Sequence, residues 1–368
     1  MKRFGKATPS AKPRGGNHLQ PTTIANFAVT YRCNGRCTTC SIWKIEDPGR
    51  GEMTLGEIRD LFELNKSFLS EVRSIQITGG EPFTRDDLPE LVSTIRRCLP
   101  RCSFWIPTNG MAPGIVEEAT RAILKGLGGE GLGVSVSIDG LGRTHDSVRG
   151  FVGSFERAVE TLRRLSAVRG EYPSLGLAVG MTVTPENFRD LHEVFALARS
   201  HGAGFSLRPV NFSRIYYRNI GGAFSMEGDA EELLPLIQGI GREILRGRGP
   251  IASAPTLRYM QGVMDFVRDP GRRRLRCSAG SDSLFLDPYG NVYPCIFLDV
   301  RMGNALESPM EEIWGSEDAS RARRMAGRGE CPGCWVECEA FRDIRRDAVG
   351  LALTAMRAIL HPHTSGIS

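Results

Sequence analysis

The sequence predicts an α/β protein built on a partial (β/α)6 barrel, with a small C-terminal domain. Short β-rich segments alternate with amphipathic segments from Thr22 to about Val210, which is typical of parallel strands with helices packed outside them. The alternation runs through six units, fewer than the eight that close a full barrel. After Cys277 the alternation of strands and helices gives way to a predicted hairpin and clustered cysteines. These observations predict an open barrel followed by a cysteine-containing extension.

Length and composition fit a globular protein. The chain has 368 residues, 41% hydrophobic and 24% charged, so about two domains and a sizeable core are expected. The net charge of +5 is modest, and acidic and basic residues are interspersed along the sequence. Nucleic-acid binding normally needs a concentrated basic stripe. No apolar run approaches the length of a membrane span, and no secretory signal is present. We therefore expect a cytoplasmic protein without a membrane span or a nucleic-acid partner.

Each barrel unit is a strand followed by a helix. The predicted strands are Ile24–Thr30, Ser74–Thr78, Ser103–Pro107, Val134–Ile138, Leu177–Thr184 and Phe205–Pro209. The predicted helices between them are Leu55–Leu69, Leu88–Cys98, Ile115–Leu124, Phe155–Val168 and Phe188–His201. Two helix starts have capping-box spacing, Thr54 with Glu57 and Asp87 with Glu90, and Pro185 suits a first helical turn.

The rest of the chain is expected to be helical apart from one hairpin. Helices are predicted at Asp229–Arg246, Thr256–Val267, Met310–Trp314 and from about Phe341 to Ile359, and the hairpin joins Leu284–Leu286 to Val292–Tyr293. The turn between the hairpin strands contains Pro, Gly and Asn, which favour turns. The predicted parts are a flexible basic tail (1–20), the barrel (21–220), a helical linker (221–275), a cysteine-rich domain (276–340) and a C-terminal helix and tail (341–368).

Three cysteines stand directly after the first predicted strand. Cys33, Cys37 and Cys40 have CxxxCxxC spacing, at the strand end where α/β barrels carry their chemistry. Four thiolates usually hold a [4Fe–4S] cluster. Three leave one iron without a protein ligand, and an open position is typical of catalytic metal sites. A structural zinc site that borrows a fourth ligand is the alternative.

This motif and the strand ends that follow it resemble the radical S-adenosylmethionine (radical SAM) family over roughly residues 22–210. The resemblance implies that Cys33, Cys37 and Cys40 hold a cluster whose open iron binds the amino and carboxylate groups of SAM. Thr39 departs from the family pattern, because many relatives carry an aromatic residue there. Trp43 or Tyr31 is the expected substitute.

Further family motifs fall at the ends of the next strands. Gly79-Gly80-Glu81-Pro82 looks like the GGEP motif, whose backbone receives the SAM amino group. The resemblance implies that Asn109, Ser137 and Asp139 line the ribose side and that Arg149 binds the SAM carboxylate. Ordinary turn chemistry, or a surface salt bridge of Arg149, is the alternative for these residues. Three more residues are expected near the same mouth, with barrel packing as the alternative: Thr182, Thr184 and Arg208.

The C-terminal cysteines resemble the auxiliary-cluster extension of radical SAM enzymes, called SPASM or, in its shortened form, twitch. The resemblance implies one auxiliary [4Fe–4S] cluster held by Cys277, Cys295, Cys331 and Cys334. Cys338 either replaces one of these ligands or remains a free thiol. A zinc site held by four cysteines is the alternative. Cys98 and Cys102 are expected to be packing residues.

The resemblance implies an enzyme that reductively cleaves SAM to a 5′-deoxyadenosyl radical and abstracts hydrogen from a substrate. A small molecule of cofactor, natural-product or sugar biosynthesis is favoured, and maturation of a ribosomally made peptide or protein is the alternative. A low-potential electron donor such as flavodoxin or ferredoxin is the expected partner. A non-catalytic iron–sulfur or zinc protein is the hypothesis from another class. No HExxH, GxSxG or P-loop motif occurs in the sequence.

Overall fold

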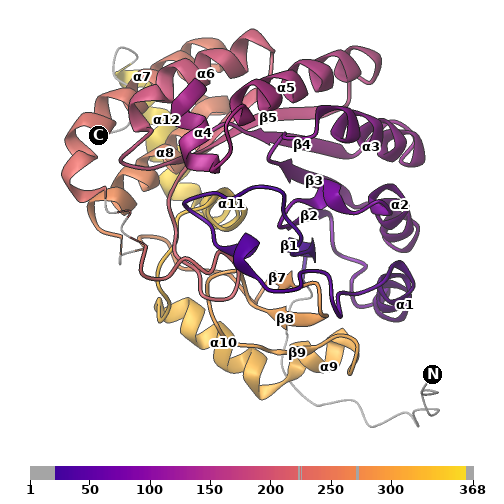
Figure 1. Cartoon of the computed structure of the whole chain (residues 1–368). Helices are drawn as coiled ribbons and strands as arrows, with labels where there is room; N and C mark the ends of the chain where they lie inside the picture. The colour runs from indigo at the N-terminus through magenta and orange to yellow at the C-terminus, as the bar shows by residue number, and fades with distance from the viewer. Residues whose placement is uncertain (1–20, 223, 225, 271–272, 362–368) are drawn as a thin grey trace.

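One mixed sheet runs through the molecule (Figure 1). The computed structural model describes residues 21–222, 224, 226–270 and 273–361. Within these ranges the sheet has nine strands in the order β6-β5-β4-β3-β2-β1-β7-β8-β9. The predicted N-terminal tail lies outside the described residues.

The first six strands are parallel and form the predicted partial barrel. They are β1 (Thr23–Thr30), β2 (Ser74–Gly79), β3 (Ser103–Thr108), β4 (Leu132–Ser137), β5 (Gly176–Val183) and β6 (Gly204–Pro209). Each pairs in parallel with its neighbour. β6 ends the sheet and does not pair with β1, so the barrel has an open side, as the six-unit pattern predicts.

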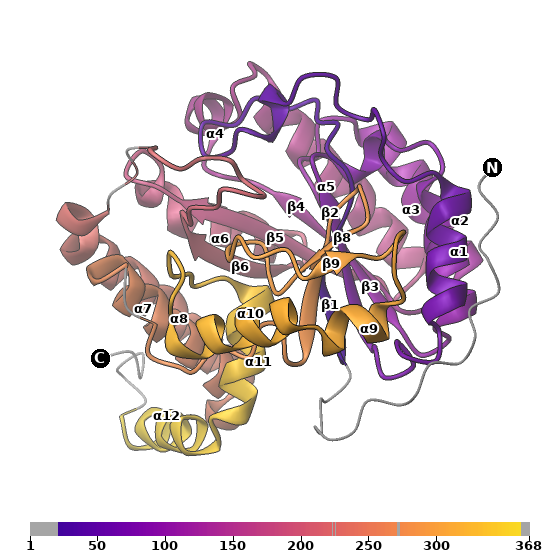
Figure 2. The same ribbon diagram turned by 90° about the horizontal axis from the view of Figure 1, so that it is seen from below.

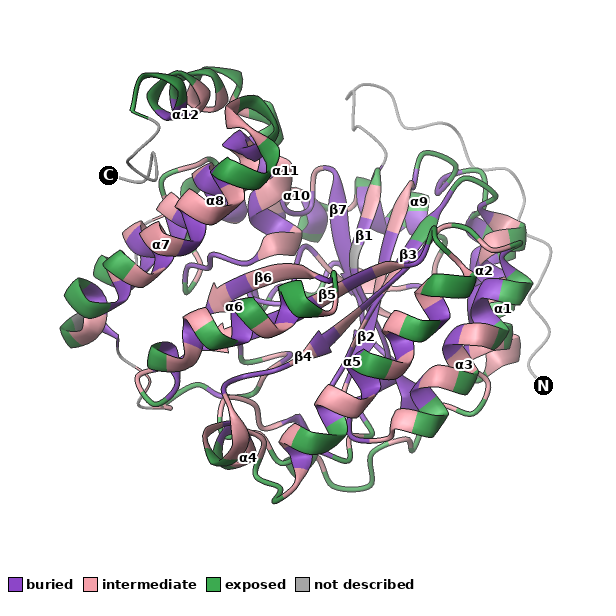
Figure 3. Cartoon of the chain, turned by 90° about the horizontal axis from the view of Figure 1, so that it is seen from above, coloured by how far each residue is buried: buried purple, intermediate pink, exposed green. Residues whose placement is uncertain are grey.

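Helices cover the outer face of these strands (Figure 3). They are α1 (Leu55–Asn65), α2 (Leu88–Cys98), α3 (Pro113–Gly126), α4 (Gly142–Arg149), α5 (Ser154–Glu171) and α6 (Leu191–Ser200). Single 3-10 turns occur at Ile42–Lys44, Pro82–Thr84, Phe188–Asp190 and Glu227–Asp229. The apolar residues of these helices recur at helical spacing and form one buried core with the sheet.

Two of the three predicted helix-start signals do not act as expected, although α2 begins at Leu88 as predicted. Thr54 and Glu57 form the expected capping box, but Asp87 caps nothing with its side chain. The Asp87 carboxylate instead accepts two hydrogen bonds from Arg85, at 2.6 and 2.7 Å. Pro185 lies in the turn before the 3-10 segment, because α6 begins only at Leu191. Helix α4 was not expected from the sequence, because its eight residues are mostly polar and show no clear apolar face.

The C-terminal part extends the barrel sheet. Its elements are α7 (Ala230–Arg248), α8 (Pro250–Arg268), β7 (Ser283–Leu286), β8 (Asn291–Tyr293), β9 (Gly303–Asn304), α9 (Met310–Gly315), α10 (Glu317–Arg328), α11 (Glu337–Arg346) and α12 (Ala348–Leu360). β7 pairs in parallel with β1 and antiparallel with β8. Figure 2 shows α9 and α10 lying across this hairpin.

The predicted helix from Phe341 to Ile359 is wrong, because two helices occupy this region. The helix is interrupted at Asp347. The side chain of Asp347 accepts a hydrogen bond from the backbone N–H of Gly350 and so caps α12. Helix α10 was not predicted either. None of the described helices is long and apolar enough to cross a membrane.

Helices α8 and α11 lie at the open side of the barrel. The Tyr259 hydroxyl of α8 donates to the Leu207 carbonyl of β6 at 3.0 Å. On the other side, α11 packs beside β1 (Figure 1). Trp335, just before α11, donates its indole N–H to the Tyr259 carbonyl at 2.8 Å. The C-terminal part therefore supplies the wall that a complete barrel would form with strands.

The loop after β1 is fixed against the end of β2. The backbone N–H groups of Gly80 and Glu81 donate to the carbonyls of Thr30 and Arg32, both at 2.8 Å. A Cβ atom on Gly80 would lie 2.2 Å from the Arg32 carbonyl oxygen. The Arg32 oxygen belongs to the backbone, so a larger residue at position 80 cannot be accommodated by turning a neighbouring side chain. Glycine is therefore needed at Gly80 for the close approach of two chain segments.

We expect Gly80→Ala to destabilise the fold by more than about 2 kcal/mol, because the new methyl group overlaps backbone. The measurement is denaturant unfolding followed by circular dichroism. Gly114→Ala in α3 is the control, since its Cβ meets nothing within 4 Å and helical alanine is favoured over glycine. Equal unfolding midpoints for Gly80→Ala and the unchanged protein would show that the contact is unimportant.

Candidate active site

A cavity of about 470 Å³ opens at the carboxyl ends of the barrel strands. This is the end at which parallel α/β barrels carry their functional loops. The predicted SAM-site residues come together here. Those that line the cavity are Cys33, Cys37, Cys40, Gly79, Gly80, Glu81, Asn109, Ser137, Asp139 and Arg149.

The cysteine loop is tied to the end of α4. The backbone N–H groups of Arg36 and Thr38 donate to the carbonyls of Arg149 and Val148, at 3.1 and 2.9 Å. Trp43 donates its indole N–H to the carbonyl of Cys40 at 2.9 Å. These contacts fix the path of the loop that carries the three thiols.

The two aromatic residues expected near SAM lie in different surroundings. Trp43 lines the cavity and is partly exposed. Tyr31 is buried outside it and packs against Tyr289, with ring centroids 5.8 Å apart. Only Trp43 is therefore available for a contact within this cavity.

Glu81 organises the ends of two strands. Its buried carboxylate accepts hydrogen bonds from the Thr108 hydroxyl at 2.9 Å and from the Asn109 backbone at 2.7 Å. Burial raises the pKa of Glu81 to about 7, although both hydrogen bonds oppose this shift. The carboxylate thus joins the loop after β2 to the loop after β3.

An ion pair lies beside the cysteine loop. Arg149 Nη2 is 2.7 Å from Asp139 Oδ2, and Arg149 Nη1 is 3.6 Å from Cys37 Sγ. The second carboxylate oxygen of Asp139 accepts from the Thr182 backbone at 2.7 Å. Arg149 Nε is buried without a hydrogen-bond partner among the described residues. A buried guanidinium with one free N–H and an adjacent thiol is suited to hold negative charge.

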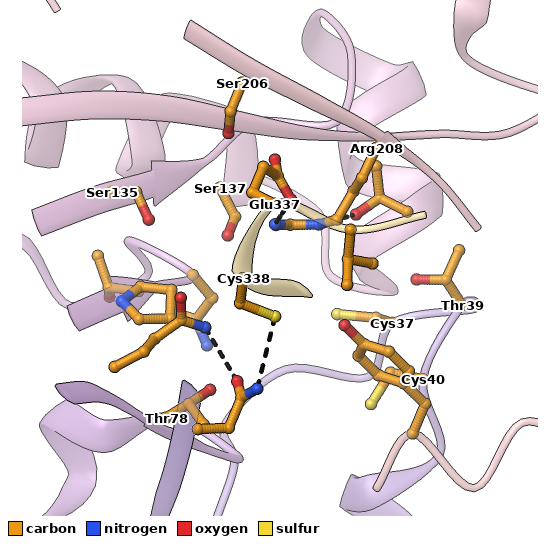
Figure 4. Close-up of a pocket in the computed structure, with 18 of the residues that line it drawn as sticks. Cys37, Thr39, Cys40, Thr78, Ser135, Ser137, Ser206, Arg208, Glu337 and Cys338 are labelled. Carbon is orange, nitrogen blue, oxygen red and sulfur yellow. Dashed lines mark hydrogen bonds and ion pairs between the residues drawn. The ribbon is translucent and has the colours of Figure 1, made fainter. Parts of the chain in front are cut away.

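The cavity continues into the barrel between small side chains. Ser135 and Ser137 of β4 and Ser206 of β6 face it (Figure 4), and their hydroxyls have no hydrogen-bond partner among the described residues. Trp105 of β3 also lines it, lying against Gly133, where a Cβ would fall 1.9 Å from the indole. Small residues therefore keep the interior open where a fully packed barrel would be filled.

The far wall carries a second ion pair. Arg208 Nη1 of β6 is 3.3 Å from Glu337 Oε2 at the start of α11, and Arg208 Nε donates to the Thr182 hydroxyl at 3.3 Å. Arg208 and Thr182 thus face the cavity as the sequence predicts. Thr184 does not line it; its backbone N–H donates to the Asn187 side chain in the following turn.

Several residues of the cavity were not expected from the sequence, because each stands within an ordinary strand or helix pattern. They are Asn26, Gln76, Trp105, Ser135, Ser206, Tyr217 and Glu337. For Asn26 and Gln76, a polar residue in the middle of an apolar parallel strand is the signal that could have identified them.

Four C-terminal cysteines surround another cavity, of about 300 Å³: Cys277, Cys295, Cys331 and Cys334. The Cys295 sulfur accepts from the backbone N–H groups of Phe297 and Leu298, both at 3.4 Å. Arg273 donates to Cys334 Sγ at 3.2 Å and pairs with the buried Asp343. Cys338 is not among these residues. It lines the first cavity instead.

Both sets of thiols suit iron–sulfur clusters. All ten cysteines are free, and backbone N–H groups donate to several of the sulfurs, as to Cys33 at 3.4 Å. Burial raises the pKa of Cys33 and of Cys40 to about 12, so a bound metal would displace their protons. Within the described residues no group of three Cys, His, Asp or Glu side chains is already arranged around a single metal ion.

The two remaining cysteines lie away from both cavities. Cys102 is buried in the core, and Cys98 is half-buried at the end of α2, where its thiol donates to Glu63 at 3.4 Å. Both are packing residues, as expected.

His145 holds the end of β4 from within the core. It is fully buried, and its Nδ1 accepts the backbone N–H of Asp139 at 3.0 Å. Burial and the nearby Arg149 lower the pKa of His145 to about 4. The neutral imidazole therefore positions Asp139 at the cavity edge.

We expect the contribution of His145 to stability to fall as the pH drops from about 7 to about 5, because the unfolded chain binds a proton at His145 that the folded chain excludes. Glu81, whose pKa is raised, shifts stability in the opposite direction over the same range, so the effect of His145 is the difference in pH slope between the unchanged protein and a His145 variant. The loss due to His145 is about 2 kcal/mol. In His145→Gln, which keeps a hydrogen-bond acceptor, this part of the pH dependence should disappear. Denaturant unfolding at both pH values measures the difference. An unchanged pH slope in the variant would contradict the assignment.

The chain matches known protein families over two segments. Residues 27–198 match the model of the radical SAM superfamily, and residues 277–339 match SPASM, an iron–sulfur cluster-binding domain. Over 342 residues the chain is 29% identical to the AdoMet-dependent heme synthase of Methanosarcina barkeri. This alignment covers 87% of this chain and 88% of the synthase. The chain is also 27% identical over 327 residues to the mycofactocin maturase MftC of Mycobacterium tuberculosis. That alignment covers 86% of this chain and 76% of MftC.

The fold is also found among solved structures. The crystal structure of Streptococcus suis SuiB bound to S-adenosylmethionine aligns with a TM-score of 0.59 at 15% identity, over 82% of this chain and 68% of SuiB. The first match includes the three cysteines of the first cavity that follow β1, and the second match includes the four cysteines of the second cavity. The chain therefore contains a radical SAM domain (27–198) followed by a SPASM-type domain (277–339); it is an enzyme whose cofactors are SAM and [4Fe–4S] clusters.

Proposed function

We propose that SAM binds in the first cavity against a [4Fe–4S] cluster held by Cys33, Cys37 and Cys40. The observation that carries this proposal is that the three thiols and the ends of β2, β3 and β4 line one cavity. When bound, the cluster supplies the electron that cleaves SAM to methionine and a 5′-deoxyadenosyl radical. The protein positions and shields such chemistry.

The side chains around the thiols have separate tasks in this proposal. The backbone of Gly79 and Gly80 receives the SAM amino group, and Arg149 attracts its carboxylate through the N–H that has no other partner. Ser137 offers a free hydroxyl to the ribose. Glu81 acts through Asn109, because its two carboxylate oxygens already accept hydrogen bonds from Thr108 at the end of β3 and from the Asn109 backbone.

The substrate is proposed to lie in the barrel interior beyond SAM and to be a small molecule. Trp105 offers a flat apolar surface there, and the hydroxyls of Ser135 and Ser206 are free to bind polar groups. The similarity to a heme synthase over most of both chains favours this class. Modification of a ribosomally made peptide is the second candidate, which the similarity to a maturase favours.

The second cavity is proposed to hold an auxiliary [4Fe–4S] cluster on Cys277, Cys295, Cys331 and Cys334. The Arg273 guanidinium beside Cys334 would offset the charge of the thiolates. The chain then divides into a SAM-binding core (21–220), a helical linker (221–275) and an auxiliary domain (276–340), followed by the C-terminal helices. A low-potential flavodoxin or ferredoxin is the proposed electron donor, and the cytoplasm the proposed location.

We expect Cys37→Ala to abolish the formation of 5′-deoxyadenosine, because the cluster loses one of three ligands. The assay is chromatography with mass spectrometry after anaerobic reconstitution and reduction by dithionite. Cys102→Ala is the matched control, since it removes a buried thiol outside both cavities and should leave cleavage intact. SAM cleavage by Cys37→Ala would refute the proposed active site.

In Cys334→Ala we expect the iron content to fall from about eight to about four atoms per chain, because one of two four-iron clusters is lost. Some SAM cleavage should remain, since the first cavity keeps its ligands. Iron analysis and visible absorbance measure the change. If the unchanged protein instead contains about one zinc ion and about four iron atoms per chain, the assignment of an auxiliary cluster is wrong.

A further inference from the structure

The fifth C-terminal cysteine belongs to the first cavity. Cys338 lines it together with Cys37 and Cys40. Figure 4 shows the Cys338 sulfur pointing into the middle of the cavity. Tyr217 lines the same cavity; burial raises the pKa of its hydroxyl, and the nearby thiols of Cys338 and Cys40 add to that shift. The Cys338 thiol therefore faces the proposed site of radical formation.

The position of Cys338 is fixed from two sides. Trp335 anchors the segment before α11: its backbone N–H donates to Asn211 at 2.9 Å, and its ring packs where a Cβ on Gly262 would fall 1.9 Å away. From the barrel, Asn26 Nδ2 donates to the Cys338 sulfur at 3.5 Å, and Gln76 donates to Asn26 at 3.0 Å. The sulfur is thus held at a defined place in the cavity.

These contacts leave the thiol hydrogen free. The Cys338 sulfur acts as an acceptor toward Asn26, and its hydrogen has no acceptor among the described residues. A buried thiol keeps its proton at neutral pH. An S–H bond is weaker than most C–H bonds, so a carbon radical takes a hydrogen atom from a thiol readily. A protonated thiol in a cavity that forms carbon radicals is therefore a hydrogen-atom source.

We propose that Cys338 is a catalytic residue that returns a hydrogen atom to the substrate radical. This inference rests on the proposed function. The S–H bond breaks, a C–H bond forms, and a thiyl radical is left on Cys338. One electron from a low-potential flavodoxin or ferredoxin and one proton from water then restore the thiol. The substrate carbon exchanges its original hydrogen for one of solvent origin, so inversion of a stereocentre is the simplest net reaction.

The proposal can be tested without a known substrate. In D₂O the Cys338 thiol becomes S–D, and during substrate-free cleavage it would quench the 5′-deoxyadenosyl radical with deuterium. The measurement is the deuterium content of the 5′-deoxyadenosine formed, by mass spectrometry, with dithionite as reductant and no added thiol. Because isotope content is expressed per molecule of product, a change in the rate of cleavage does not affect it.

We expect mono-deuterated 5′-deoxyadenosine from the unchanged enzyme and from Cys102→Ala. Cys338→Ala and Cys338→Ser should lose this species, because neither methyl nor hydroxyl hydrogen is readily abstracted. Product without deuterium from the unchanged enzyme, or equal deuterium in the Cys338 variants, would overturn the proposal and spare the proposed function. Absence of 5′-deoxyadenosine from the unchanged enzyme would overturn both.

Iron analysis provides a readout independent of turnover. Cys338→Ala should retain the iron content and visible absorbance of the unchanged protein, whereas Cys334→Ala should not. Loss of iron in Cys338→Ala would make Cys338 a cluster ligand and would also overturn its role as a hydrogen donor.

Discussion

Strand β1 is hydrogen-bonded on both edges, and the arrangement of both cavities depends on this. On one side it pairs with β2, whose end fixes the cysteine loop. On the other it pairs with β7, the first strand of the C-terminal hairpin. Since the loop with Cys33 leaves β1 directly, the first cavity and the C-terminal extension are positioned from the same strand. The extension cannot move as a separate body without breaking this ladder.

Each cavity pairs a buried arginine with an aspartate beside a thiol. Arg149 lies between Asp139 and Cys37, and Arg273 lies between Asp343 and Cys334. A lone buried guanidinium would be costly, so each aspartate compensates its partner's charge. The arrangement leaves an N–H group directed at sulfur. Hydrogen bonds from neighbouring side chains to the ligand atoms tune the properties of a metal site.

Local signals were enough to predict the barrel and the motif residues that line the first cavity. Alternating strands and helices fix which strand ends are neighbours, and the motif residues stand at those ends. Contacts that join distant segments could not be predicted in this way. The engagement of Asp139 by Arg149 and the pairing of β7 with β1 both depend on tertiary packing. The separation of Cys338 from Cys334 follows from the start of a helix between them, which cysteine spacing does not reveal.

The paired edge of β1 has a consequence for how the two halves of the chain can be exchanged during evolution. An unpaired strand edge invites association with other chains. Removing the hairpin would expose four β1 positions that now match β7, from Thr23 to Phe27. Any replacement for this extension must therefore bring a strand of its own. The barrel can accept diverse C-terminal modules only if each begins by completing the same sheet.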